Sequence, residues 1–91
     1  MDLNTQNERW YKFESEIVLD NLDFLLRLKK IYPSLSKEDI RILMFMKIKM
    51  PNKEIAKMLN ILLDSLRLRR WRIKKKMGNI NCPLSKFIET F

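Results

Sequence analysis

The sequence predicts an all-α fold, on three observations. The chain has 91 residues but only one Gly and three Pro, which are too few turn residues for a meander of short strands. Apolar residues recur at spacings of three, four and seven residues, the periodicity of amphipathic helices. Apolar residues make up 46% of the chain and charged residues 33%, a composition typical of a globular domain rather than of a disordered segment.

A long first helix is expected from Glu8 to Ile31, because nothing in that stretch breaks a helix. Its apolar stripe consists of Trp10, Phe13, Ile17, Phe24, Leu28 and Ile31. The stripe is interpreted as core that covers the rest of the domain. A dimerising seam is the alternative, since positions 17, 24, 28 and 31 also fit heptad spacing. Pro33 disfavours helical geometry at Tyr32 and ends this helix. Residues 1–34 are therefore assigned to an N-terminal helix that packs on, or leads into, a domain formed by residues 35–91.

Two shorter helices are expected next. Ser36 is suited to cap the first of them, and Asp39, three residues later, stands in for the Glu or Gln of a capping box. The apolar face of this helix comprises Ile40, Leu43, Met44 and Ile48. Pro51 marks the following break, and Met50 or Asn52 is expected to cap a helix of about nine residues. Its apolar positions are Ile55, Ala56, Met58 and Leu59.

A turn over residues 60–63 leads into a fourth helix that runs roughly from Asp64 to Met77. Asn60 is the residue of this turn best suited to a left-handed conformation, and Gly78 is placed for a left-handed C-cap. On the fourth helix the buried face is expected to comprise Leu66, Ile73 and Met77, with the stem of Arg70 covering their edge. A terminal helix is expected to begin at Pro83, and its apolar positions are Leu84, Phe87, Ile88 and Phe91.

The net charge of +8 is concentrated in one part of the chain. Residues 1–30 carry five basic and six acidic side chains, whereas residues 47–76 carry eleven basic and two acidic ones. Such a field favours a polyanionic partner, either nucleic acid or an anionic membrane surface.

Two short helices joined by a tight turn, the second of them strongly basic, form the layout of a helix-turn-helix, whose second helix enters the major groove of DNA. The face of this helix opposite its buried positions carries cations around two apolar side chains. It consists of Asp64, Arg67, Leu68, Trp71, Arg72, Lys74 and Lys75.

The motifs Leu35-Ser-Lys-Glu-Asp39, Asn52-Lys-Glu-Ile-Ala-Lys-Met-Leu-Asn-Ile61, Ser65-Leu66 and Lys75-Lys-Met-Gly78 resemble the LuxR-type (GerE-like) effector domain of bacterial transcription regulators. Trp10, Phe13-Glu14 and residues 32–36 are similar to the segment that precedes this domain at the C-terminus of Bacteroidetes sensor and regulator proteins. The resemblance implies a four-helix helix-turn-helix domain, here with an additional long N-terminal helix. It also implies a homodimer on double-stranded DNA, through the terminal helix 83–91 or the N-terminal helix.

The resemblance also implies the DNA-binding residues. It places contacts to the bases at Arg67, Leu68 and Trp71. Contacts to the DNA backbone are implied for Ser65, Arg70, Arg72, Lys74 and Lys75, and Lys53 completes the expected set. The sequence departs from the family at Pro51 and at Leu62-Leu63, where relatives place capping residues, so Asp64 is expected to cap the recognition helix.

Two of these basic-helix residues have alternative interpretations. Trp71 is alternatively a core residue or an anchor for another protein. Arg69 is left out of the site, because an ion pair with an acid such as Glu54 is as well supported as a phosphate contact.

Other functional classes find less support. No His, no second Cys and no nucleophile–base pair is present, so no enzyme, metal, cofactor or small-molecule ligand is expected. No apolar run is long enough to span a membrane and no signal-peptide layout is present, so a cytoplasmic, nucleoid-associated protein is expected. The main alternative is a basic helical module that binds another protein or an anionic membrane. RNA is disfavoured because the major groove of its A-form helix is too narrow for an exposed helix.

Overall fold

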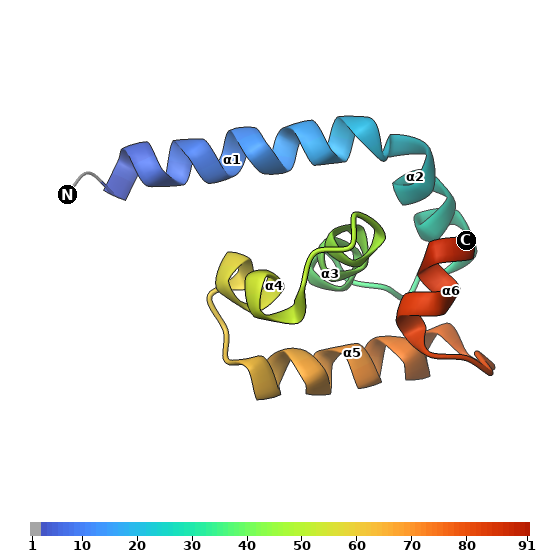
Figure 1. Ribbon diagram of the computed structural model, residues 1–91. Coiled ribbons are helices and arrows are strands. Elements are labelled where there is room, and N and C mark those ends of the chain that lie inside the picture. The colour runs from blue at the N-terminus through green and yellow to red at the C-terminus, as the bar shows by residue number, and fades with distance from the viewer. Residues whose placement is uncertain (1–2) are drawn as a thin grey trace.

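The computed structural model describes residues 3–91, with side chains described from residue 12 onward, and this part of the chain is all-helical. The expected all-α class is confirmed. Figure 1 shows α3 and α4 between α1 on one side and α5 on the opposite side, with α2 and α6 at one end. The helices are α1 (Leu3–Asp20), α2 (Leu22–Ile31), α3 (Lys37–Lys47), α4 (Asn52–Leu59), α5 (Leu63–Met77) and α6 (Leu84–Thr90).

The N-terminal helix is bent, so the prediction of one continuous helix to Ile31 is wrong. The chain turns at Asn21, which separates α1 from α2 and has φ −120° and ψ 22°. The Nδ2 of Asn21 donates a hydrogen bond of 2.8 Å to the carbonyl oxygen of Ile17, which also accepts the Asn21 backbone N–H. An Asn side chain that competes for backbone groups in this way disfavours a straight helix. The bend turns α2 away from the line of α1 (Figure 1), and α2 packs against α3.

The N-terminal apolar stripe is core over its middle section only. Ile17, Phe24 and Leu28 are buried within the chain, which confirms the core interpretation and removes these three residues from any dimerising seam. Phe13 and Ile31 are exposed, at 41% and 55%, so the two ends of the stripe do not belong to the core. The Trp10 position lies outside the residues whose side chains are described.

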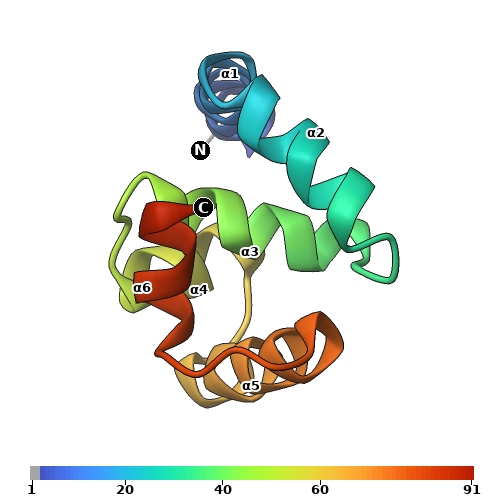
Figure 2. The ribbon, with the colours of Figure 1, turned by 90° about the vertical axis from the view of Figure 1, so that its right-hand side faces the viewer.

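Helix α3 is the centre of the domain, with α1 and α2 on one side of it and α5 on the other (Figure 2). Its expected capping box is confirmed: Ser36 Oγ accepts the backbone N–H of Asp39, and Asp39 Oδ2 accepts the backbone N–H of Ser36. The buried face of α3 is wider than predicted. Ile48 is exposed, whereas Ile42 and Phe45 are fully buried, because α2, α5 and α6 all pack against this helix.

Helix α3 ends in a residue of unusual backbone conformation. Lys49 has φ 63°, and the N–H of Met50 donates to the carbonyl oxygen of Phe45, while that of Lys49 donates to Met46. These two bonds form a Schellman motif, in which glycine usually occupies the left-handed position.

We expect Lys49→Gly to raise the free energy of unfolding by about 1 kcal/mol, because the left-handed conformation strains a residue that has a Cβ. Urea denaturation monitored by circular dichroism measures the change. Lys57→Gly is the matched control. It places glycine inside α4 and should lower stability by about 1 kcal/mol. A loss of stability in both variants would contradict the assignment of strain to Lys49.

Helices α4 and α5 are joined by a tight turn and pack against each other. Ile55, Ala56 and Leu59 of α4 and Leu66 of α5 are buried, and the predicted left-handed turn residue is confirmed, since Asn60 has φ 55° and ψ 47°. A large side chain in place of Ala56 has no room at this interface.

The capping predictions for these two helices are wrong. The residues before α4 and α5 are Pro51 and Leu62, and neither helix has a side-chain cap. Asp64 lies inside the first turn of α5 instead of preceding it. At the other end of α5, Gly78 has the predicted positive φ, 90°, but its ψ of −139° lies outside the left-handed helical region.

Helix α6 begins at Leu84, one residue later than predicted. Leu84 and Ile88 are buried. The centroid of the Phe91 ring lies 5.9 Å from that of Phe24 and 6.1 Å from that of Tyr32. The apolar face of this helix is therefore occupied within the chain.

Candidate nucleic-acid interface

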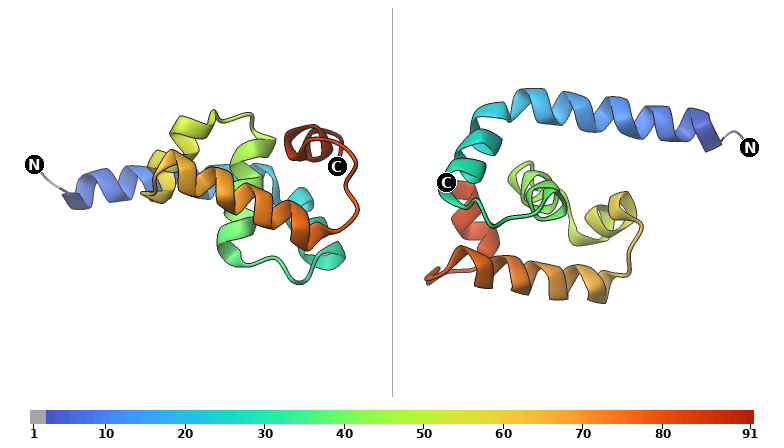
Figure 3. Two further views of the ribbon diagram at one scale, coloured as in Figure 1. Left: turned by 90° about the horizontal axis from the view of Figure 1, so that it is seen from below. Right: turned by 180° about the vertical axis from the view of Figure 1, so that it is seen from behind.

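Helix α5 lies at the edge of the domain with one face in the core and the other in solvent (Figure 3). Leu66, Ile73 and Met77 are buried, as predicted. The opposite face has at its centre the line Asp64, Leu68, Trp71 and Lys75, whose spacing of four, three and four residues places them on one side of a helix.

Two large apolar side chains are exposed on this outer face. Leu68 is 47% exposed and Trp71 is 58% exposed, so the interpretation of Trp71 as a core residue is wrong. The Nζ of Lys75 lies 4.9 Å from the centroid of the Trp71 ring, which is within cation–π range. Exposed aromatic and leucine side chains surrounded by cations are a surface that a purely solvated helix has no reason to present.

Cations flank this central line on both sides. Arg67 lies on one side, where its Nη1 is 3.1 Å from Asp64 Oδ1. Half-buried Lys74 lies on the same side and exposed Arg72 on the other. The remaining predicted residues, Ser65 and Lys53, are also exposed.

Three further cations of α5 are bound by the body of the domain. Arg69 Nη1 lies 3.2 Å from Glu38 Oε1, and Lys76 Nζ lies 2.6 Å from Asp39 Oδ2. The expected ion pair of Arg69 therefore exists, with Glu38 rather than Glu54 as its partner. Arg70 donates a hydrogen bond of 2.7 Å to Asn52 Oδ1 at the start of α4.

Arg70 is thus placed differently from the other predicted phosphate contacts. It is half-buried, and burial lowers the pKa of its guanidinium from the usual value, although arginine remains charged in proteins. Its position fits the predicted packing of its stem beside the buried face of α5. Its guanidinium fixes α5 against α4, whereas Arg67, Arg72, Lys74 and Lys75 extend from the outer side.

Asp39 is the acid on which the Lys76 contact depends. Burial by itself raises the pKa of this carboxyl, but the hydrogen bonds from Lys76 Nζ and from the backbone and side chain of Ser36 outweigh it and hold the pKa below its usual value of 3.8. Ionised Asp39 therefore stabilises the fold above the pKa of the unfolded chain, and this contribution is lost as the pH falls through the lower pKa of the folded state.

We expect the stability difference between the wild-type chain and Asp39→Asn to be largest near neutral pH and to shrink on acidification below about pH 4. Thermal denaturation between pH 7 and pH 2 measures it. Asp20→Asn, which removes an exposed acid, is the control for the loss of one negative charge. A wild-type advantage over Asp39→Asn that stays constant to the lowest pH would contradict the lowered pKa.

Sequence reasoning missed the acceptors that hold α5, namely Glu38, Asp39 and Asn52. The sequence contained one signal for these contacts. Two adjacent acids stand at the start of α3, and seven cations stand between Arg67 and Lys76 of α5. The spacing of residues along one helix does not show which cation meets which acid.

Within residues 12–91 no group of three or more His, Cys, Asp or Glu side chains could hold a metal ion. The thiol of Cys82 is free and half-buried. Across the described helices, none is long and apolar enough to cross a membrane.

Comparisons of the sequence with protein-family models, with curated proteins and with solved structures find no significant match.

Proposed function

We propose that this chain is the DNA-binding output domain of a bacterial transcription regulator, with α5 lying in the major groove of double-stranded DNA in a LuxR-type arrangement. The supporting observation is the outer face of α5, where exposed Leu68 and Trp71 lie among cations while α4 packs behind the helix. The major groove is wide enough to admit an α-helix, and its negative phosphates border both sides of it.

The arrangement of the outer face suggests a role for each side chain. The Arg67 guanidinium is suited to bind O6 and N7 of guanine, and Leu68 and Trp71 are suited to contact thymine methyl groups. The cations that flank the central line, Arg72 on one side and Lys74 on the other, are suited to bind the two phosphate backbones. Lys75, Ser65 and Lys53 add backbone contacts.

We further propose that two copies bind neighbouring half-sites, about 34 Å apart, and that the protein works in the cytoplasm on the nucleoid. Because Leu84, Ile88 and Phe91 pack within the chain, a dimer contact through α6 would use its polar side, where Lys86 and Glu89 are exposed. Sedimentation velocity with and without operator DNA measures this association.

Membrane binding fits the same helix less well. A helix that lies in a membrane surface needs one broad apolar face, whereas Leu66 and Ile73 face the core and only Leu68 and Trp71 face outward.

The fluorescence of Trp71 tests the proposal directly. In a Trp10→Phe variant Trp71 is the one remaining tryptophan, and duplex DNA should quench or shift its emission in a saturable, salt-sensitive manner. A variant that binds duplex with unchanged Trp71 emission would place the DNA on another surface. A shift with anionic vesicles but none with duplex would favour the membrane alternative.

Asp64 is the one acid on the outer face of α5, and it pairs with Arg67. We expect Asp64→Asn to raise affinity for random duplex DNA by about two- to fivefold near 0.15 M salt, because it removes a repulsive charge and releases Arg67. Fluorescence anisotropy measures the gain. Glu89→Gln on α6 removes the same charge elsewhere and should change affinity less. An equal gain in both variants would show that only net charge matters.

A further inference from the structure

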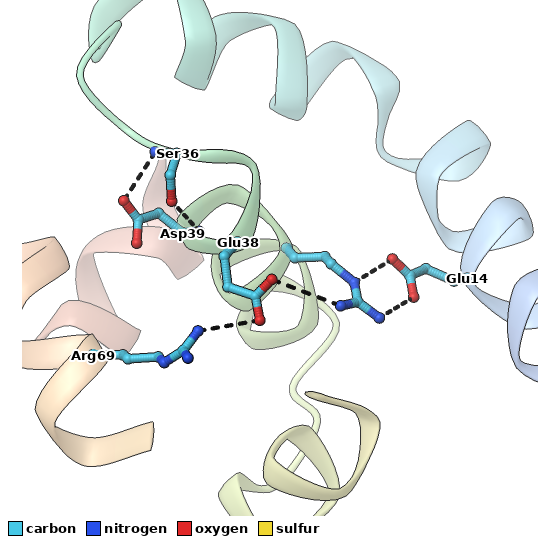
Figure 4. Close-up of polar contacts among 6 residues, drawn as sticks. Glu14, Ser36, Glu38, Asp39 and Arg69 are labelled. Carbon is cyan, nitrogen blue, oxygen red and sulfur yellow. Dashed lines mark hydrogen bonds and ion pairs between the residues drawn. The ribbon is translucent and has the colours of Figure 1, made fainter. Parts of the chain in front are cut away.

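A chain of ion pairs connects the N-terminal helix with the basic helix (Figure 4). The guanidinium of Arg41 on α3 binds Glu14 of α1 with both ends, its Nε 2.6 Å from Oε2 and its Nη2 2.8 Å from Oε1. On its other side, Arg41 Nη1 lies 3.9 Å from Oε2 of Glu38. The second oxygen of Glu38 lies 3.2 Å from Nη1 of Arg69 on α5.

Glu38 is therefore shared by two arginines that do not hold it equally. Arg69 is within ion-pair contact, whereas Arg41 is at the limit of such contact, because its bidentate pair with Glu14 draws the guanidinium toward α1. Bidentate arginine–carboxylate pairs are the stronger kind. Arg41 and Glu38 are also three residues apart on one helix, a spacing at which their side chains can form a close ion pair.

The ion pair of Glu14 with Arg41 is one of the contacts that attach α1 to the domain. Of the side chains described for α1, residues 12–20, Ile17 alone is buried, and the Glu14 side chain is 22% exposed. Over residues 12–20, α1 is held by Ile17, by partly buried Val18 and by the Glu14 ion pair, so this part of the helix separates from the domain at lower cost than a core helix.

We propose that docking of α1 controls whether Arg69 is available to bind a DNA phosphate. While Glu14 holds Arg41, Glu38 holds Arg69 against the body of the domain. When α1 leaves, Arg41 turns to Glu38, and Arg69 is released beside Arg72 as an additional cation at the edge of the DNA-binding face. The effect on DNA rests on the proposed function, whereas the exchange of ion-pair partners does not.

The position of Arg69 suits this conditional role. Its side chain is 39% exposed in the pair with Glu38, so the guanidinium is already at the surface and needs only a change of rotamer to reach solvent. On the helix it lies between the buried line of Leu66 and Ile73 and the exposed side that carries Arg72. A signal that moves α1 would then change the affinity for DNA without altering α5 itself.

Four variants test the proposal on the full chain, namely Glu14→Gln, Arg69→Gln, the double variant, and Glu16→Gln. Glu16 is an exposed acid on the same helix and controls for the lost charge. By anisotropy with duplex DNA, Glu14→Gln should bind about fivefold more tightly near 0.15 M salt and make the slope of log K against log salt steeper by about 0.9, as one added phosphate contact requires. Arg69→Gln should cancel this gain in the double variant and change the affinity of the wild-type chain little.

An equal gain in Glu16→Gln, or a gain that persists in the double variant, would overturn the proposal. A second measurement without DNA separates this failure from a failure of the proposed function. Arg69→Gln should lower the denaturation temperature less in the Glu14→Gln background than in the wild-type chain, because Glu38 is then held by Arg41. If the wild-type chain bound no duplex, the proposed DNA binding would be refuted. If the temperature shifts of Glu14→Gln and Arg69→Gln were additive, the exchange of ion-pair partners would be refuted, whether or not the chain binds DNA.

Discussion

Leu66→Ala is expected to lower the free energy of unfolding by about 2–5 kcal/mol. The side chain of Leu66 is 0% exposed where α5 packs on α4, so its removal leaves a cavity that the surrounding helices close only in part. Domains of this size are commonly stabilised by about 5–15 kcal/mol in total. The variant is therefore expected to lose a large share of the stability of the domain. Urea denaturation monitored by circular dichroism measures the loss.

Leu62→Ala is the matched control, since Leu62 is 76% exposed at the start of the same helix. It should change stability by no more than about 0.5 kcal/mol. Equal losses for the two variants would contradict the orientation of α5, and with it the identity of the outer face.

The triple variant Arg72→Gln, Lys74→Gln, Lys75→Gln is expected to bind duplex DNA roughly a hundredfold more weakly near 0.15 M salt, since each lost phosphate contact gives up the counterions that it released. The slope of log K against log salt should become shallower by about 2.7. These residues make no contact with the core acids, so the fold should be retained. Fluorescence anisotropy across a salt series measures both quantities.

The control for this prediction is the triple variant Lys12→Gln, Lys29→Gln, Lys30→Gln, which removes the same charge from exposed positions of α1 and α2. It should lose several-fold at most, because charges beyond a Debye length of about 8 Å from the DNA are largely screened. A loss as large as that of the α5 variant would mean that net charge, and not the outer face of α5, determines affinity.

The features that the sequence predicted correctly are those that depend on nearby residues. The partners of the capping box, Ser36 and Asp39, are three positions apart, and the left-handed conformation of Asn60 follows from its residue type. The burial of Leu66, Ile73 and Met77 follows from helical spacing. The same spacing predicted the outer face of α5, and Leu68 and Trp71 are exposed there as expected.

The features that it missed depend on tertiary contacts. The bend at Asn21 has a local cause, the hydrogen bond from the Asn21 side chain to Ile17. It is also favoured because α2 buries Phe24 and Leu28 against the domain, a gain that a local pattern does not contain. The partners of Arg69, Arg70 and Lys76 come from α3 and α4, at separations of eighteen residues or more. Lys49 adopts a left-handed conformation that its residue type gave no reason to expect.

The decisive measurement for α5 is the binding of random duplex DNA by the wild-type chain, followed by anisotropy at several salt concentrations with anionic vesicles in parallel. If α5 lies in the major groove, dissociation constants should be in the micromolar range and rise steeply with salt, with no preference for vesicles over duplex. Absence of duplex binding even at low salt, or binding to vesicles in preference to duplex, would contradict the assignment of α5 as a DNA-recognition helix.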